Sequence, residues 1–267
     1  MTVTLITGCS SGIGRAAAAI FAQRGHVVVA TMRRPDRAEP LGAGVEVRAL
    51  DVADDDSVRA TVASVVADHG GIDVVISNAG IGIDGTTEEL TLDDFRASFE
   101  TNVLGSVRLL QAMMPLWRQR QGGRFIAVGS VAGAVGQPFN DAYCTSKFAL
   151  EGLLESLHPV AAQHGVHLSV VEAGPVGVEF AQRYGPPASR SINSPYAAAR
   201  ARFQAVQDGG YANAQTNEEI AAILWDVATA ESPSLRYQSS EMVSKVVGMK
   251  FKDMTGERIT GLTARWI

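Results

Sequence analysis

The stretch that decides the fold is Val3-Thr-Leu-Ile-Thr7, followed directly by Gly8-Cys-Ser-Ser-Gly-Ile-Gly14 and then by Arg15-Ala-Ala-Ala-Ala19. The short β-branched, apolar run predicts a buried strand, and the run of small residues predicts a helix. A glycine-rich turn between a strand and a helix lets backbone N–H groups approach a pyrophosphate. Tight turns also need glycine, so it is the flanking strand and helix that favour a phosphate site.

Short apolar runs alternate with amphipathic helices through the first two thirds of the chain. The predicted strands are Val3–Thr7, Val27–Thr31, Val45–Leu50, Ile72–Ser77, Arg124–Gly129 and Val166–Glu172. The predicted helices span residues 12–24, 55–69, 92–119 and 141–164. In the third helix we expect one core-facing stripe, which comprises Phe95, Phe99, Val103, Val107, Leu110 and Met114. This order predicts an α/β fold, a single Rossmann-like doubly wound parallel sheet flanked by helices, with residues 1–267 as one domain.

Further helix starts are indicated by capping residues. Thr91 with Asp94 and Thr216 with Glu219 have the spacing of a capping box, and Ser194 precedes Pro195 at a first helical position. Residues 184–194 are a composition break that favours neither strand nor helix, and we expect a helix near 195–208. We predict that 184–215 forms a helical substrate lid.

Composition narrows the partner classes. The 267 residues carry 23 Lys and Arg against 28 Asp and Glu, a net charge of −5 without like-charge blocks. This balance disfavours nucleic acid and anionic membrane surfaces and favours a small-molecule partner. Two cysteines are too few for a disulfide framework, which favours a reducing compartment. We find no apolar run long enough to span a bilayer and no signal peptide, so we expect a cytoplasmic protein.

The cofactor choice depends on the end of the second strand. Arg33 and Arg34 stand about twenty residues beyond Gly14, where an NAD-binding fold usually has an acid for the ribose 2′-hydroxyl. A guanidinium suits the 2′-phosphate of NADP, so we predict NADP(H) over NAD(H). A solvated arginine pair at a strand end is the alternative interpretation.

A candidate catalytic set follows the fifth strand. Ser130 ends that strand, and Tyr143-Cys-Thr-Ser-Lys147 begins thirteen residues later with Tyr143 and Lys147 on one helix face. An ammonium about 5 Å away, at an effective dielectric of about 20, stabilises a phenolate by about 3 kcal/mol, or about two pKa units. The phenol could then exchange a proton, while Ser130 holds a carbonyl oxygen. Taken singly, Tyr143 could be a core residue, Lys147 a solvated helix residue and Ser130 a strand end.

The chain resembles the short-chain dehydrogenase/reductase family. The motifs that carry the resemblance are the glycine loop, Asn78-Ala79-Gly80, Asn102, Ser130, Tyr143, Lys147 and Gly174-Pro175, all in the family's order. The resemblance implies that Tyr143 is the general acid-base, Lys147 binds the nicotinamide ribose and tunes Tyr143, Ser130 orients the carbonyl, and Asn102 supports a water in the proton relay. The implied cofactor contacts are Gly8, Ser10, Ser11, Gly12, Ile13, Gly14, Arg33, Asp51, Val52, Asn78, Ala79, Gly80, Tyr143, Lys147, Pro175 and Val176.

Three segments are similar to the estradiol-type 17β-hydroxysteroid and photoreceptor-type retinol dehydrogenases, namely Phe139–Gly152, Gly165–Ser169 and Pro233–Tyr237. This likeness implies interconversion of a ketone or aldehyde with an alcohol on an apolar substrate. Two features depart from the pattern. Gly177-Val178 stands where the family often has a Thr that contacts the carboxamide, and no His follows His167. A distal steroid hydroxyl would therefore lack an imidazole partner.

Several alternatives stay open at this stage. The substrate could be a retinoid, a 3-oxoacyl thioester or another metabolite, and the protein could be an NADP-binding sensor or scaffold that lost its chemistry. Asn102 could simply bend its helix by bonding to backbone. We expect no metal site, and we expect Cys9 and Cys144 to be packed side chains rather than redox centres. A homodimer or homotetramer through helices 92–119 and 141–164 is expected from the resemblance.

Overall fold

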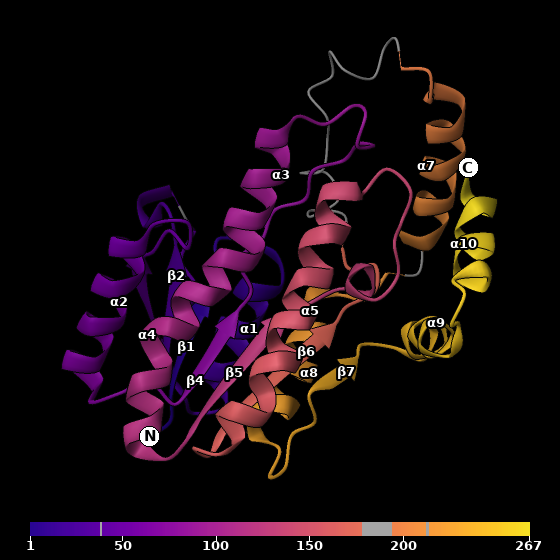
Figure 1. The fold of residues 1–267 in the computed structure, drawn as a ribbon. Helices are drawn as coiled ribbons and strands as arrows, with labels where there is room; N and C mark the ends of the chain where they lie inside the picture. The colour runs from indigo at the N-terminus through magenta and orange to yellow at the C-terminus, as the bar shows by residue number, and fades with distance from the viewer. Residues whose placement is uncertain (38, 178–193, 212–213) are drawn as a thin grey trace.

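The computed structural model describes residues 1–37, 39–177, 194–211 and 214–267. Among these residues, seven strands form one parallel sheet in the order β3-β2-β1-β4-β5-β6-β7 (Figure 1). The strands are β1 (Val3–Thr7), β2 (Val27–Met32), β3 (Val45–Ala49), β4 (Val74–Ser77), β5 (Gly123–Val128), β6 (Val166–Glu172) and β7 (Arg236–Gln238). The strand order reverses between β1 and β4, and in such sheets a ligand crevice lies beyond the carboxyl ends of the strands at this point.

Helices cover both faces of the sheet (Figure 1). One apolar layer joins the sheet to α1 (Gly12–Gln23) and α8 (Asn217–Thr229). The other joins it to α2 (Asp55–His69), α4 (Gly105–Arg120) and α5 (Asp141–Ala162). The other α-helices in the described part of the chain are α3 (Leu92–Phe99), α7 (Ala197–Tyr211), α9 (Glu241–Lys252) and α10 (Glu257–Thr263). The two layers confirm the predicted doubly wound α/β architecture.

Most predicted elements lie within two residues of their expected bounds, because each strand is a compact apolar run and each helix has a recognisable start. Both capping boxes are formed, Thr91 with Asp94 at α3 and Thr216 with Glu219 at α8. The helix predicted from Pro195 begins two residues later, at Ala197. Strand β7 was not predicted, since three half-buried residues carry no periodicity.

The helix predicted over 92–119 is interrupted by a π-helical turn, Glu100–Leu104, between α3 and α4. The extra residue in this turn rotates the buried face, so the predicted core-facing stripe was wrong in part. Val103 and Leu110 are buried, whereas Phe95, Phe99, Val107 and Met114 are only half-buried. The side chains that are buried instead are Ser98, Asn102, Ser106, Leu109, Met113 and Trp117.

Candidate active site

The glycine loop connects β1 to α1 at the reversal of strand order. Gly8 and Gly12 have φ angles of +73° and +61°, which side chains rarely adopt. A Cβ at Gly14 would lie 2.4 Å from Asn78 Nδ2 and 2.6 Å from Gly8 O, so only glycine fits there. Ser11 precedes α1 in extended conformation and its side chain does not cap the helix. The first N–H groups of α1 therefore remain available to an anion.

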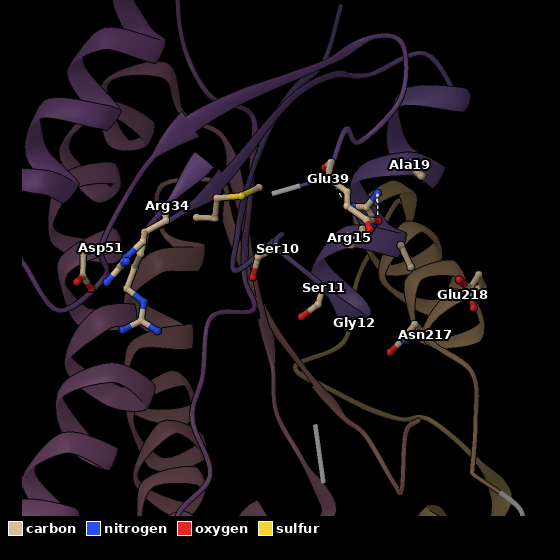
Figure 2. Close-up of a pocket in the computed structure, with 13 residues that line it drawn as sticks. Ser10, Ser11, Gly12, Arg15, Ala19, Arg34, Glu39, Asp51, Asn217 and Glu218 are labelled. Atoms are coloured by element: carbon tan, nitrogen blue, oxygen red, sulfur yellow. Dashed lines mark hydrogen bonds and ion pairs between the residues drawn. The ribbon is translucent and has the colours of Figure 1, made fainter. Parts of the chain in front are cut away.

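An open cavity of about 1030 Å³ lies beside this loop (Figure 2). Its lining residues include Ser10, Ser11, Gly12, Arg15, Met32, Arg33, Arg34, Glu39, Asp51, Asn217 and Glu218. The volume and the donor set fit the adenosine and phosphate part of a nicotinamide dinucleotide: backbone N–H groups at one end and guanidinium groups at the rim. Of the predicted contacts, the structure brings Ser10, Ser11, Gly12, Arg33 and Asp51 into this one cavity.

Three arginines and three acidic residues, Glu39, Asp51 and Glu218, line the cavity. Arg33 and Arg34 are exposed and line the cavity next to Asp51, as Figure 2 shows for Arg34. Arg15 lies on the opposite side, where its guanidinium donates to Glu39 O at 3.1 Å and to Pro40 O at 2.7 Å. Three guanidinium groups therefore surround one opening.

Two of these lining residues, Arg15 and Asn217, were not singled out from the sequence. The signal for Arg15 was its place directly after Gly14. Asn217 is the first residue of α8, and its Oδ1 would lie 3.7 Å from a Cβ at Gly12. Only the folded chain brings α8 to the glycine loop, so no local pattern could have identified Asn217.

Asn78 and its neighbours serve the loop rather than the open cavity. The Asn78 side chain donates to Thr7 O at 2.8 Å and to Gly8 O at 3.2 Å, and the N–H groups of Asn78 and Ala79 donate to Thr7 Oγ1 at 3.0 Å. These bonds join the carboxyl ends of β1 and β4. Val52 is buried against α4, with its side chain close to Gly105, and it is not among the cavity-lining residues.

Tyr143 and Lys147 lie one turn apart near the start of α5, and both are buried. Lys147 Nζ lies 5.7 Å from the centre of the Tyr143 ring and donates to Val128 O at 2.8 Å. Burial lowers the pKa of Lys147 to about 8. The pair has the predicted spacing, but the ammonium that would polarise the phenol keeps its charge only below about pH 8.

Asn102 occupies the π-helical turn and connects three segments. Its Oδ1 accepts from Ile81 N at 2.8 Å, and its Nδ2 donates to Ile81 O at 2.9 Å and to Ser146 Oγ at 2.9 Å. The side chain is 2% exposed. Asn102 thus fixes the segment after Gly80 against α5, one residue from Lys147.

Ser130 follows β5 and begins a short 3-10 turn, where its Oγ accepts from Ala132 N at 3.1 Å. This bond leaves the hydroxyl proton free to be donated elsewhere. After β6, Pro175 and Val176 are half-buried, and Pro175 O accepts from Gln215 N at 3.0 Å. Val178, which departs from the family pattern, lies outside the described residues.

Helix α7 covers most of the helix predicted near 195–208, while residues 184–193 and 212–213 of the predicted lid lie outside the described residues. Arg200 on α7 binds Asp84 and Glu89, the latter at 2.7 Å, and stacks on Phe139 with 4.6 Å between the guanidinium carbon and the ring centre. Phe203 lies 5.6 Å from Phe139 between ring centres. Phe139 and Phe203 therefore form an aromatic cluster with Arg200, and Phe139 precedes Tyr143 by four residues.

Both cysteines are free and buried, as predicted for packed side chains. Burial raises the pKa of Cys9 to about 12 and that of Cys144 to about 11. Neither thiol ionises near neutral pH, so neither is a reactive thiolate.

Two searches cover the described part of the chain. No helix in those ranges combines the length and apolarity that a bilayer crossing requires. The same ranges contain no group of three or more His, Cys, Asp or Glu side chains suited to hold a metal ion.

Comparison with known proteins identifies the family. Residues 2–188 match the model of the short chain dehydrogenase family. Human 17-beta-hydroxysteroid dehydrogenase type 1 is 38% identical over 272 residues, which cover 96% of this chain and 82% of that protein. Human retinol dehydrogenase 8 is 33% identical over 287 residues, 98% of this chain and 88% of that protein.

A solved short-chain dehydrogenase from Streptomyces avermitilis superposes with a TM-score of 0.80 at 28% identity, over 98% of this chain and 100% of that one. The chain therefore belongs to the short-chain dehydrogenase family. Its members are oxidoreductases that act on CH–OH groups with NAD(P). The family assignment confirms the resemblance drawn from the glycine loop and from Tyr143 and Lys147.

Proposed function

We propose that this protein interconverts a ketone or aldehyde with an alcohol on an apolar substrate, with NADP(H) as the preferred cofactor. The observation that carries the proposal is the buried pair Tyr143 and Lys147, with Lys147 Nζ held by Val128 O. A buried ammonium one turn from a phenol is costly, and proton exchange by that phenol gives the pair a chemical use. A sensor of NADP would need no such pair.

In this mechanism bound NADPH would supply the hydride to the carbonyl carbon. Tyr143 donates its phenolic proton to the carbonyl oxygen, and Lys147 stabilises the phenolate that forms. Ser130 donates its hydroxyl proton to the same oxygen and so orients the carbonyl. Asn102 holds the backbone of Ile81 and the helix that carries Lys147, and supports the water through which Tyr143 is reprotonated.

The preference for NADP(H) is supported by the two arginines that follow β2 at the rim of the cavity. Arg33 and Arg34 stand at the end of β2, and neither has an acidic partner among its described contacts. Guanidinium groups bind a phosphate through charge-assisted hydrogen bonds, whereas a bare ribose hydroxyl gains little from them.

An apolar substrate is supported by the aromatic cluster at Phe139, which precedes Tyr143 by four residues. Phe139 and Phe203 are each 4% exposed, and Trp266 lies 6.3 Å from Phe203 between ring centres. The names of the relatives, a 17-beta-hydroxysteroid dehydrogenase and a retinol dehydrogenase, point to the same substrate class. A steroid or a retinoid is our proposal for this chain.

We also propose that the chain forms a homodimer or homotetramer through α4 and α5. Leu104, the last residue of the π-helical turn before α4, is 41% exposed, and Phe148 on α5 is 39% exposed. Phe99 on α3 and Val107 on α4 are half-buried. Apolar side chains gathered on one helical surface are typical of a subunit contact.

The test is NADPH oxidation, with the product identified by mass spectrometry, over 17-keto steroids, retinal, 3-oxoacyl thioesters and aromatic aldehydes. Replacing Tyr143 by Phe is expected to lower turnover by at least about 10² to 10³ while NADPH affinity is kept. Tyr237→Phe is the matched control, because its hydroxyl accepts from Ser234 N at β7. Near-normal turnover in Tyr143→Phe would contradict the assignment.

A further inference from the structure

Charged side chains gather behind Lys147, on the side away from Tyr143 along α5. Glu151 follows Lys147 by one turn, and Glu172 is the last residue of β6. Their exposed fractions are 8% and 0%. Both line a cavity of about 160 Å³ that also touches Arg236 on β7 and Lys250 on α9. The two residues therefore border the same small, partly open cavity.

Each carboxyl group has one oxygen with a partner and one without. Arg236 Nε donates to Glu151 Oε2 at 2.9 Å, and Gln238 Nε2 donates to Glu172 Oε2 at 2.5 Å. Among the described residues, Oε1 of Glu151 and Oε1 of Glu172 are buried with no hydrogen-bond partner. A buried carboxylate oxygen without a donor is costly, and a proton on one of the two groups would remove part of that cost.

Among the described contacts, Arg236 is the cation that is hydrogen-bonded to the pair. Arg236 divides its guanidinium between Glu151 and the exposed Glu155. Glu172 accepts from a neutral amide, that of Gln238, and the charge of Arg236 also acts on it. Burial and the neighbouring charge of Glu172 raise the pKa of Glu151 to about 7, and burial raises the pKa of Glu172.

We propose that Glu151 and Glu172 together hold one proton in the folded protein at neutral pH, and that Glu151 is thereby a positioning residue for the charge of Lys147. The proton itself comes from solvent and is independent of the reaction. The effect on Lys147 rests on the proposed function, in which the ammonium of Lys147 assists Tyr143.

The charge of Glu151 changes the pKa of Lys147 in a defined direction. Burial lowers the pKa of Lys147 to about 8, and the negative charge of Glu151 opposes this. As pH rises through about 7, Glu151 loses its proton, and its charge keeps Lys147 protonated to higher pH. The other charged groups that face Glu151 are Glu155 on the same helix, Glu172 on β6, Arg236 on β7 and Lys250 on α9.

The proton held by Glu151 and Glu172 is tested by measuring thermal stability against pH, in the absence of substrate. The pKa of Glu151 rises from 4.5 to about 7 on folding, so the folded state binds more protons in this window. The thermal midpoint of the wild type should fall as pH increases from 5 to 8, and the slope should be smaller in Glu151→Gln. Glu172→Gln should move the fall to lower pH, because it removes the charge that raises the pKa of Glu151. Parallel curves for wild type and both variants would refute the shared proton.

The coupling to Lys147 is tested by the pH profile of kcat/KM for the best carbonyl substrate of the panel. In Glu151→Gln the alkaline limb should move to lower pH by about half a unit or more, since Lys147 loses the opposing charge. Glu155→Gln is the control, because Glu155 also contacts Arg236 but lies a turn further from Lys147. The alkaline limb of this variant should stay in place. An unshifted limb in Glu151→Gln would refute the coupling, whereas Tyr143→Phe independently tests the proposed function.

Discussion

The cofactor cavity is built from backbone turns at the ends of paired strands, whereas α7 is held beside the active site by charged side chains. In the cavity, sheet pairing fixes the glycine loop, and Asn78 bonds to its carbonyl groups. At α7, Arg200 binds Asp84, which is 116 positions away in the sequence. The glycine loop tolerates little displacement of its backbone atoms. The position of α7, in contrast, can shift whenever one of its charged side chains is replaced. The comparison indicates that the cofactor side is fixed by backbone contacts, whereas the α7 side, which we propose for the substrate, depends on a few charged side chains.

The largest effect on stability and cofactor binding is expected from a substitution in the glycine loop. In Gly14→Ala a Cβ would lie 2.6 Å from Gly8 O, so the loop must move. We expect the free energy of unfolding to fall by about 3 kcal/mol and NADPH affinity to weaken by at least about 100-fold. Thermal unfolding and NADPH fluorescence titration measure the two effects.

Gly152→Ala is the matched control, because Gly152 is also helical and nothing lies within 4 Å of its added Cβ. Alanine has the higher helix propensity, so this variant should be more stable by about 0.5–1 kcal/mol. Equal behaviour of the two variants would mean that the glycine loop is not the rigid element that the comparison describes.

An intermediate effect is expected at the cavity rim. Arg33→Asp should lower the ratio of NADPH to NADH affinity at least about tenfold, since a carboxylate repels the 2′-phosphate and binds the 2′-hydroxyl. Arg118→Asp makes the same charge change at the end of α4, near the opposite end of the sheet, and should leave the ratio unchanged. An unchanged ratio in Arg33→Asp would assign Arg33 to solvent and remove the support for NADP(H).

The smallest effect is expected at α7. Arg200→Met removes the partner of Asp84 and Glu89, so α7 should loosen while Tyr143 and Lys147 keep their places. KM for the apolar substrate should rise by about three- to tenfold with kcat nearly unchanged, which is the signature of lost uniform binding. Arg202→Met, an exposed residue on the same helix, should leave KM as it is. A change in kcat alone would place Arg200 in the chemistry instead.

The ion pair of Arg200 with Asp84 also predicts that KM depends on pH. Burial raises the pKa of Asp84, so Asp84 takes up a proton at higher pH than an exposed aspartate and then binds Arg200 less strongly. KM for the apolar substrate should therefore rise as pH falls toward the acid range, and this rise should be absent in Arg200→Met. Steady-state kinetics across the acid range measure it.

Local patterns were enough to predict the cofactor side from the sequence, because a strand, a glycine turn and a helix follow one another within residues 3–23. The spacing of Tyr143 and Lys147 was visible for the same reason. The π-helical turn at Glu100–Leu104 was not, since no residue type marks it, and this displaced the predicted stripe. The contacts of Arg200 with Asp84 and of Glu151 with Arg236 join distant segments, so only the folded chain reveals them.

The hydrogen bonds between Asn78 and the glycine loop also limit how a dinucleotide can leave. The hydrogen bonds of Asn78 with Thr7 and Gly8 join the ends of β1 and β4. A dinucleotide cannot leave on this side unless the two strands separate. Release must then proceed over the outer rim, where Arg34 and Glu39 are exposed. Attraction between exposed charges weakens with ionic strength. The residence time of the bound dinucleotide should therefore shorten in high salt, even where the catalytic step itself does not change.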